Sequence, residues 1–277
     1  MAIVISEDSV GAEPLGPRVE RRRLLTGERV KDTRVLLERR NLAAGAAVEI
    51  AVPAASLVWL QILEGEVVLR HSAEEEPLSP AHIVFLPPRF RGTLASPAGA
   101  ALLHAEVPDA ARFDPNLSRN PPPLRVVDWT REPVLDSKHD RRKRIYVLTP
   151  ALFDTTAIKG EMIIYPPGTQ AANHHHEGAE HFMYFTRGRG TAWANESPFA
   201  VKKGDLVYYG ERERHYLKSE GSEDMVFVEF FVPGKYKTIW APGAAVCTWL
   251  PTGRDIRGRI PARDIAAHSS AAAPQDV

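Results

Sequence analysis

Proline and glycine divide this chain into short segments, and this limits what it can fold into. The sequence contains 23 prolines and 19 glycines, and the proline content exceeds a typical share of about 5%. Because proline ends helices and both residues favour turns, we expect no long helix. The remaining segments are rich in β-branched and aromatic residues, which are typical of strands. They cover residues 47–52, 57–63, 66–69, 83–86, 162–165, 182–185, 205–209 and 225–232. The sequence therefore predicts an all-β fold.

Two halves of the chain repeat one pattern. In each half a strand is followed by a glycine turn, at Gly65 or Gly188, and then by two further strands separated by another turn. We interpret this repetition as an internal duplication. Between the halves, six prolines and no sustained strand pattern predict a linker. The expected parts are a first domain over residues 20–107, a linker over 108–140, a second domain over 141–262 and a flexible tail over 263–277.

Charge and cysteine content exclude several classes of function. The chain has 35 basic and 35 acidic residues, so it lacks the positive field that non-specific nucleic-acid binding needs. One cysteine, Cys247, forms neither an intramolecular disulfide nor a cysteine-rich zinc site. No apolar stretch is long enough to span a membrane, and the first residues lack the basic region of a secretory signal. We therefore expect a cytoplasmic protein that binds a small molecule, without nucleic-acid or membrane partners.

A group of histidines with one glutamate carries the clearest chemical signal. His174 and His176 are two residues apart, so in a strand they point to the same face while His175 points away. Glu180 follows closely, and His215 comes after a later turn. A barrel that pairs these strands would bring His215 to the same centre as His174 and His176, which is the arrangement of a metal site.

The spacing resembles the two metal-binding motifs of the cupin superfamily. The residues at motif positions are Gly168, His174, His176, Glu180, Gly204, Asp205 and His215. This resemblance implies a jelly-roll barrel, or double-stranded β-helix, that holds one divalent metal through His174, His176, Glu180 and His215. Applied to both halves, it implies tandem barrels, a bicupin, and a homodimer.

The match departs from the family pattern in two ways. Residues 210–212 and Ser219 replace a usual Pro-x-Gly and a usual asparagine of the second motif. In the first motif, the spacing to the closing Gly188 fits His181 better than Glu180. His181 is therefore an alternative ligand to Glu180. If it is not a ligand, it would support the metal site from outside or carry a proton.

The first half lacks metal-binding side chains at the equivalent places. When the glycine turns of the two halves are matched, the ligand positions fall at Ala51, Pro53, Leu57 and Gly92. We therefore expect a degenerate, metal-free N-terminal barrel. Its expected roles are to stabilise the second barrel, to extend a dimer interface or to wall the mouth of the active site.

Basic residues near the histidine motif have two interpretations. Arg187 and Arg189 flank the turn that closes the motif, and they are either solvated turn residues or a basic rim that attracts a carboxylate. Together with His181 they are the candidate catalytic residues. The basic run over residues 141–144 is expected at an exposed strand edge, where charges discourage pairing between chains.

Three hypotheses for function follow from the metal site. The leading one is an Fe(II) dioxygenase of a small, carboxylate-bearing compound, aromatic acids included. The alternative enzyme is a non-redox cupin with Mn(II), Ni(II), Co(II) or Zn(II), acting as an aminohydrolase, decarboxylase or isomerase with His181 or Glu177 as proton carrier. The third is a metal-containing protein that binds a small molecule without turnover.

Overall fold

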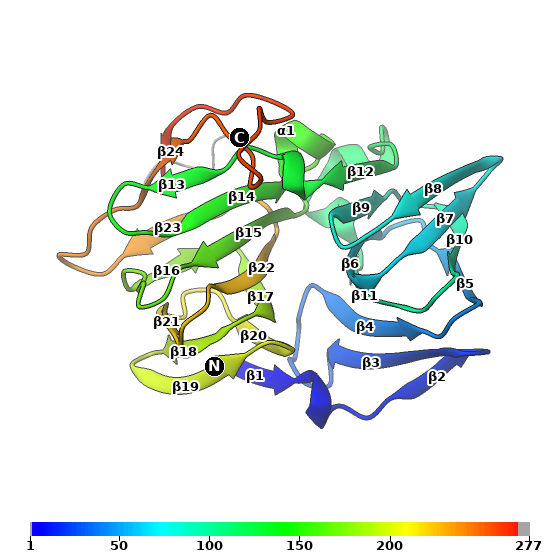
Figure 1. Ribbon diagram of the computed structural model, residues 1–277, viewed down its shortest axis with the longest axis horizontal. Coiled ribbons are helices and arrows are strands. Elements are labelled where there is room, and N and C mark those ends of the chain that lie inside the picture. Colours follow the sequence, from blue (N-terminus) through cyan, green and yellow to red (C-terminus); the bar gives the residue numbers. More distant parts are fainter. Residues whose placement is uncertain (1, 271–277) are drawn as a thin grey trace. The chain divides into compact units, whose positions relative to one another are not determined.

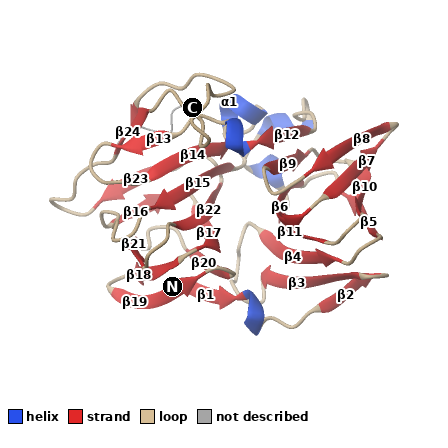
Figure 2. Ribbon diagram, in the orientation of Figure 1, coloured by secondary structure: helices blue, strands red, loops and turns tan. Residues whose placement is uncertain are grey.

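The computed structural model describes residues 2–270, and almost all of its regular structure is β-sheet (Figures 1 and 2). The chain forms two compact units, one from residues 7–129 and the other from residues 2–6 with residues 130–270. Each unit contains a large and a small antiparallel sheet. The predicted all-β fold of tandem jelly-roll barrels is confirmed. Residues 271–277, which belong to the expected tail, lie outside the described residues.

The N-terminal unit, residues 7–129, contains a seven-stranded and a four-stranded sheet. Its strands are β2 (Glu13–Gly16), β3 (Val19–Leu25), β4 (Leu36–Leu42), β5 (Ala46–Ala51), β6 (Leu57–Gly65), β7 (Val67–His71), β8 (Glu74–Leu78), β9 (His82–Leu86), β10 (Arg91–Ser96), β11 (Ala100–Val107) and β12 (Arg125–Asp128). The strand orders are β12-β9-β6-β11-β4-β3-β2 and β5-β10-β7-β8. Its short 3-10 helices are η1 (Glu7–Ser9), η2 (Ala110–Arg112) and η3 (Pro115–Ser118).

The C-terminal unit contains a nine-stranded and a five-stranded sheet. Its strands are β1 (Ile3–Ser6), β13 (Leu135–Ser137), β14 (Lys143–Leu148), β15 (Lys159–Tyr165), β16 (His174–Glu177), β17 (Glu180–Arg187), β18 (Arg189–Ala194), β19 (Ser197–Lys202), β20 (Asp205–Tyr209), β21 (His215–Glu220), β22 (Met225–Val232), β23 (Lys237–Trp240), β24 (Thr248–Pro251) and β25 (His268–Ser269). The strand orders are β1-β20-β17-β22-β15-β14-β13-β24-β25 and β19-β18-β21-β16-β23. The helices are η4 (Trp129–Arg131) and α1 (Pro150–Phe153).

Strand alternation builds a separate apolar core in each unit. In β6, Val58, Leu60 and Ile62 point to one face and join the N-terminal core. In β17, Met183 and Phe185 do the same in the C-terminal core. These side chains are almost fully buried, and burial of each contributes roughly 1.5–3 kcal/mol. The core therefore fixes which face of each strand points into its barrel.

The two units share one detailed strand register. Gly65 and Gly188 have φ angles of 71° and 73°, a conformation that favours glycine. A Cβ at either position would lie 2.1 Å or 2.5 Å from the backbone oxygen of Gly99 or Asp224, respectively. Just before each glycine, the pairing of β6 with β11, and of β17 with β22, shifts by one residue at a bulge. Both units therefore repeat the same strand arrangement, which the sequence pattern indicated.

Two parts of the chain differ from the expected division. Within the expected linker, residues 108–140, β12 pairs with β9, and β13 pairs with β14 and β24. Within the expected tail, β25 pairs with β24, and Ile265 contacts an apolar cluster. The local sequence of these segments shows little of the alternation that predicts a strand. Contacts with distant strands order them, and such contacts cannot be read from local composition.

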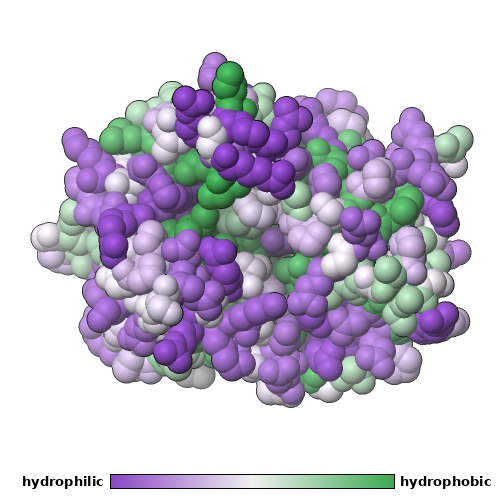
Figure 3. Space-filling view, in the orientation of Figure 1, coloured by the Kyte–Doolittle hydropathy of each residue, from purple (hydrophilic) through white to green (hydrophobic). Residues whose placement is uncertain are grey.

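Hydrophilic residues cover most of the face drawn in Figure 3, and hydrophobic residues show there in smaller groups. This distribution follows from the alternation described above, which turns apolar side chains into the barrels. Among residues 2–270, no helix has the length and apolar character needed to cross a membrane.

Candidate metal centre

Three histidines converge inside the C-terminal barrel from two neighbouring strands. His174 and His176 lie on β16, and His215 begins β21 directly opposite His174 in the antiparallel register. The ring centres of His174 and His176 are 5.0 Å apart, and those of His174 and His215 are 4.4 Å apart. The structure thus brings together three of the residues that the sequence indicated. Their ring nitrogens are close enough to bind one metal ion.

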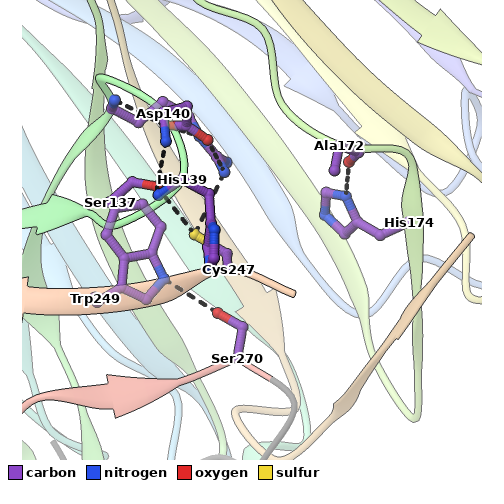
Figure 4. Close-up of polar contacts among 9 residues, drawn as sticks. Ser137, His139, Asp140, Ala172, His174, Cys247, Trp249 and Ser270 are labelled. Carbon is purple, nitrogen blue, oxygen red and sulfur yellow. Dashed lines mark hydrogen bonds and ion pairs between the residues drawn. The ribbon is translucent and has the colours of Figure 1, made fainter. Parts of the chain in front are cut away.

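Contacts at Nδ1 orient these three rings. His174 Nδ1 lies 2.8 Å from the carbonyl oxygen of Ala172, as Figure 4 shows, and His215 Nδ1 lies 2.8 Å from that of Glu213. His176 Nδ1 lies 3.2 Å from Thr238 Oγ1. A carbonyl oxygen accepts a proton from Nδ1–H, which leaves the lone pair of Nε2 for a metal. This geometry is typical of metal-binding histidines.

His181 completes a group of four imidazoles. It lies on β17, with its ring centre 4.5 Å from that of His215 and 4.8 Å from that of His176. Glu180 precedes it on the strand and therefore faces the other side of the sheet. There its carboxylate accepts a hydrogen bond of 2.9 Å from the Tyr208 hydroxyl. Of the two alternatives, the structure places His181 beside the other histidines, whereas Glu180 lies on the opposite face of the strand.

Burial keeps these imidazoles neutral. It lowers the pKa of His174, His176 and His181 well below 6.5, and neighbouring imidazoles lower it further. The pKa of His215 is lowered to about 4, again mainly by burial. Neutral imidazole is the form that binds metals.

Unpaired nitrogens indicate that the cluster fits a metal. In the described part of the chain, residues 2–270, both ring nitrogens of His181 and Nε2 of His215 are buried and form no hydrogen bond. Leaving such groups unpaired costs free energy, and coordination of a metal would satisfy them. The residues present therefore fit a divalent metal held by imidazoles.

A cavity of about 60 Å³ borders His174 and His176. Its walls come mainly from β14, β15, β22, β23 and β24. The charged and aromatic side chains around it are Arg142, Arg144, Lys159, Glu161, Glu229, Tyr146, Tyr165, Tyr236, Trp240 and Trp249. A volume of this size holds a few water molecules or a compound of few non-hydrogen atoms.

Two arginines of this cavity were missed as site residues. Residues 141–144 were expected at an exposed strand edge, but Arg142 is 6% exposed and the Arg144 side chain 14%. Arg144 pairs with Glu161 at 2.8 Å, and its guanidinium carbon lies 4.0 Å from the ring centre of Trp249. The expectation fails because β13 and β24 continue the sheet beyond β14, so β14 is not an edge strand.

Arg142 lies beside Cys247 at the outer part of this wall. Its guanidinium binds both carboxylate oxygens of Asp140, with distances of 2.7–2.9 Å. Its Nη2 lies 3.4 Å from Cys247 Sγ, and Ser137 Oγ lies 3.5 Å from the same sulfur. Figure 4 shows Cys247 near Ser137 and Trp249. Burial opposes the charges of Arg142 and Arg144, but nearby negative groups outweigh this effect and raise the pKa of both.

The two arginines that the sequence suggested lie elsewhere. Arg187 is exposed at the far end of β17 and pairs with Asp224 at 3.1 Å. It lies six positions after His181 on the strand, a span of roughly 20 Å at about 3.3 Å per residue. Arg189 is exposed at the start of β18, opposite Glu220. Neither arginine lines the cavity at the histidine cluster, which favours their interpretation as solvated turn residues.

Two buried glutamates lie near the histidine cluster, in the same sheet as His181. Glu161 on β15 and Glu229 on β22 are cross-strand partners, and Glu229 Oε1 lies 3.6 Å from His181 Nε2. Burial raises the pKa of Glu229 well above 4.5, and the nearby Glu161 raises it further. The sequence held a signal for this group, since Glu229 interrupts an otherwise apolar strand. A lone charge in such a strand needs a partner or a role.

Comparisons with known proteins agree with this architecture. Residues 161–231 match the family model of the cupin domain. A variant of oxalate decarboxylase from Bacillus subtilis is similar to 86% of this chain over 78% of its own length, with a TM-score of 0.67 and 14% identity. A second variant of that protein gives a TM-score of 0.68 and 15% identity over the same shares. The fold is that of the cupins.

The family match and the structural likeness cover different parts of the chain. The domain model covers the segment from β15 to β22 and includes all four clustered histidines. The likeness in structure extends over most of both units. Together they support the cupin superfamily that the histidine motif suggested. A search of curated proteins gave no match.

Proposed function

We propose that the C-terminal unit is a metal-dependent enzyme that acts on a small carboxylate-bearing molecule. One observation carries this proposal: four imidazoles converge beside a cavity that is also lined by two arginines with little solvent exposure. The imidazoles offer ligands for a metal, and the arginines offer donors for an anion. Perturbed ionisable groups gathered in one cavity are typical of active sites.

The residues that would hold the metal are His174, His176, His181 and His215. When bound, a divalent metal would supply Lewis-acid polarisation of the substrate or, as iron, reactivity towards oxygen. Fe(II), Mn(II), Ni(II), Co(II) and Zn(II) all accept imidazole nitrogen, so the donor set is compatible with each of them.

The cavity residues define what the substrate can be. The guanidinium groups of Arg142 and Arg144 favour a carboxylate, and their pairing with Asp140 and Glu161 keeps them fixed before the substrate binds. Trp249 and neighbouring aromatic rings restrict water in the cavity. The small volume favours an acid of few non-hydrogen atoms over a large aromatic acid.

Glu229 is placed to hold a proton for the reaction. Burial favours its protonated form, and its carboxyl group lies beside the His181 ring. From this position it would donate a proton to a carbanion left when a carboxylate is lost as carbon dioxide. This feature favours the non-redox alternative, decarboxylation in particular. Fe(II) dioxygenase chemistry is the second candidate, because Fe(II) also binds imidazole nitrogens.

The test combines metal analysis with two product measurements. Protein purified without an affinity tag is analysed by elemental mass spectrometry, then assayed for carbon dioxide release and oxygen uptake with small mono- and dicarboxylic acids. Carbon dioxide release without oxygen uptake is the expected result. Substrate-dependent oxygen uptake with bound iron would instead support the dioxygenase. Metal binding without turnover of any acid would support a binding protein and contradict the proposed enzyme.

A further inference from the structure

The N-terminal unit contains a cavity of about 540 Å³ that is bordered by charged side chains and has no metal-binding histidine cluster. It lies against β3, β4 and β11, and its charged side chains include Arg21, Arg23, Glu38, Arg40, His104 and Glu106. In the same unit, Val19, Leu42 and Leu102 of these strands belong to the apolar core. Because residues two apart share a face, the polar residues continue the inward face of the sheet.

This cavity occupies the place that the candidate active site occupies in the other unit. In the C-terminal unit, Glu161 pairs in register with both Tyr146 and Glu229. In the N-terminal unit, Glu38 pairs in register with both Arg23 and His104. The pairing of β3 with β4, and that of β14 with β15, then shifts by one residue at equivalent points.

The equivalent positions also carry an equivalent ion pair. Arg21 lies 3.1 Å from Glu38, as Arg144 lies 2.8 Å from Glu161. The duplication therefore preserved a charged pocket wall in both barrels. We infer that the shared wall serves ligand binding in both.

The metal positions of the N-terminal barrel hold other residues. When the glycine turns Gly65 and Gly188 are matched, Ala51, Pro53, Val58 and Gly92 fall where the C-terminal barrel has its four histidines. These side chains offer no metal ligand. A ligand of this cavity is therefore recognised by charge and hydrogen bonding alone.

The arginines of the cavity lie on one side of it and are paired with glutamates of the chain, Arg40 with Glu38 and Arg23 with Glu13. Arg21, Arg23 and Arg40 lie on the neighbouring strands β3 and β4, and Arg40 is only 8% exposed. The Nε of Arg21 is buried, and the contacts of residues 2–270 give it no hydrogen bond. Its carboxylate partners are Glu38, 3.1 Å from Nη1, and Glu13, 3.4 Å from this Nε, and these ion pairs hold the guanidinium in place beside the cavity.

Glu106 supplies the opposite charge from β11. Within the described residues, its carboxylate forms no hydrogen bond and no ion pair. His104, two residues before it, is buried, and burial lowers its pKa well below 6.5. The β11 side therefore presents one free negative charge beside a neutral imidazole.

We propose that the N-terminal barrel binds a small zwitterion, such as a free α-amino acid, without a metal. Its carboxylate would bind the arginines of β3 and β4, and its ammonium group would bind Glu106. A dicarboxylate would place one negative charge against Glu106. A simple amine would face the opposite side, where three guanidinium groups outnumber their two glutamate partners, Glu13 and Glu38. The cavity volume is sufficient for an amino acid with its side chain. This proposal concerns a site separate from the proposed active site.

The test measures binding of amino acids to the full-length protein. The twenty free α-amino acids are screened by thermal shift, and those that raise the melting temperature are measured by isothermal titration calorimetry. At least one is expected to bind, and Glu106→Gln is expected to weaken that binding at least tenfold. Arg23→Gln should weaken it as well. Arg23 is chosen because it is half-exposed, so its replacement leaves the fold intact.

Two controls separate this site from the other barrel. Glu75→Gln changes an exposed carboxylate on β8, outside the cavity, and should leave binding unchanged. His176→Ala changes the histidine cluster and should also leave it unchanged. The proposal is overturned if no amino acid binds, if Glu106→Gln binds as tightly as the parent protein, or if His176→Ala abolishes binding.

Discussion

Glu180 and His181 are adjacent in β17 and face opposite sides of its sheet. Glu180 accepts a hydrogen bond from Tyr208, whereas the ring of His181 lies within 5 Å of the rings of His176 and His215, at 4.8 Å and 4.5 Å. A strand cannot turn two successive side chains to one face. Only one of this pair can therefore join the histidine cluster, and His181 is the one whose ring lies there.

Substitution of each residue tests this assignment. His181→Gln should lower the metal content, because it removes one of four converging imidazoles. Glu180→Gln should retain the metal, because its carboxylate faces away from the cluster. Both variants are analysed by elemental mass spectrometry after purification without a tag, with circular dichroism to check the fold. Loss of metal in Glu180→Gln with retention in His181→Gln would reverse the assignment.

Arg144 is expected to bind the substrate carboxylate. Arg144→Lys keeps the charge opposite Glu161 but loses the planar guanidinium, so the Michaelis constant should rise about tenfold, the effect of losing roughly 1.5 kcal/mol of charged hydrogen bonding. Metal content should not change. Arg187→Lys is the matched control on the exposed end of β17, and it should have no effect on steady-state kinetics. Equal effects in both variants would contradict the cavity assignment.

The features of the site that depend on the pattern within a single strand could be predicted from the sequence. The period of two along β16 and the glycine-bounded segments were enough to predict the barrel and the convergence of His174 and His176. Arg144 and Glu229 were not predicted as site residues. They lie near the histidines only because strands that are distant in the sequence pair with one another. Arg187 was chosen because it is close to the motif in sequence, but an extended strand carries it away from the centre.

Glu229 is expected to act as a proton donor in the proposed reaction. Glu229→Gln preserves the shape of the side chain and removes its acidic proton, so kcat should fall about 10²–10⁴-fold, the usual contribution of general acid catalysis. The Michaelis constant should change little. The Glu229 carboxylate also lies within 4.8 Å of ligand nitrogens of His176 and His181, so loss of metal in this variant would identify Glu229 as a ligand instead. Steady-state kinetics and elemental analysis of the variant check this. A variant with unchanged kcat would exclude Glu229 as the proton donor.

The histidine cluster should make the stability of the metal-free protein depend on pH. His215 has a pKa of about 4 in the folded protein, against 6.5 when it is exposed in the unfolded chain. Between these values the unfolded chain binds more protons, so the free energy of unfolding rises with pH from about 4 to 6.5. The stability contributed by the neutral imidazole is present above pH 6.5 and is lost as the pH falls towards 4. For His215 alone this amounts to about 3 kcal/mol.

Urea unfolding of the chelator-treated protein at several values between pH 4.5 and 7.5 measures this dependence. Carboxylates also titrate at the acidic end, so the informative quantity is the difference between the parent protein and His215→Gln. Removing one titrating imidazole should reduce the slope of stability against pH by up to about 1.4 kcal/mol per pH unit. Identical slopes in the two proteins would show that His215 is accessible to protons in the folded state. That result would contradict the conclusion that the histidine cluster is buried and neutral in the folded protein.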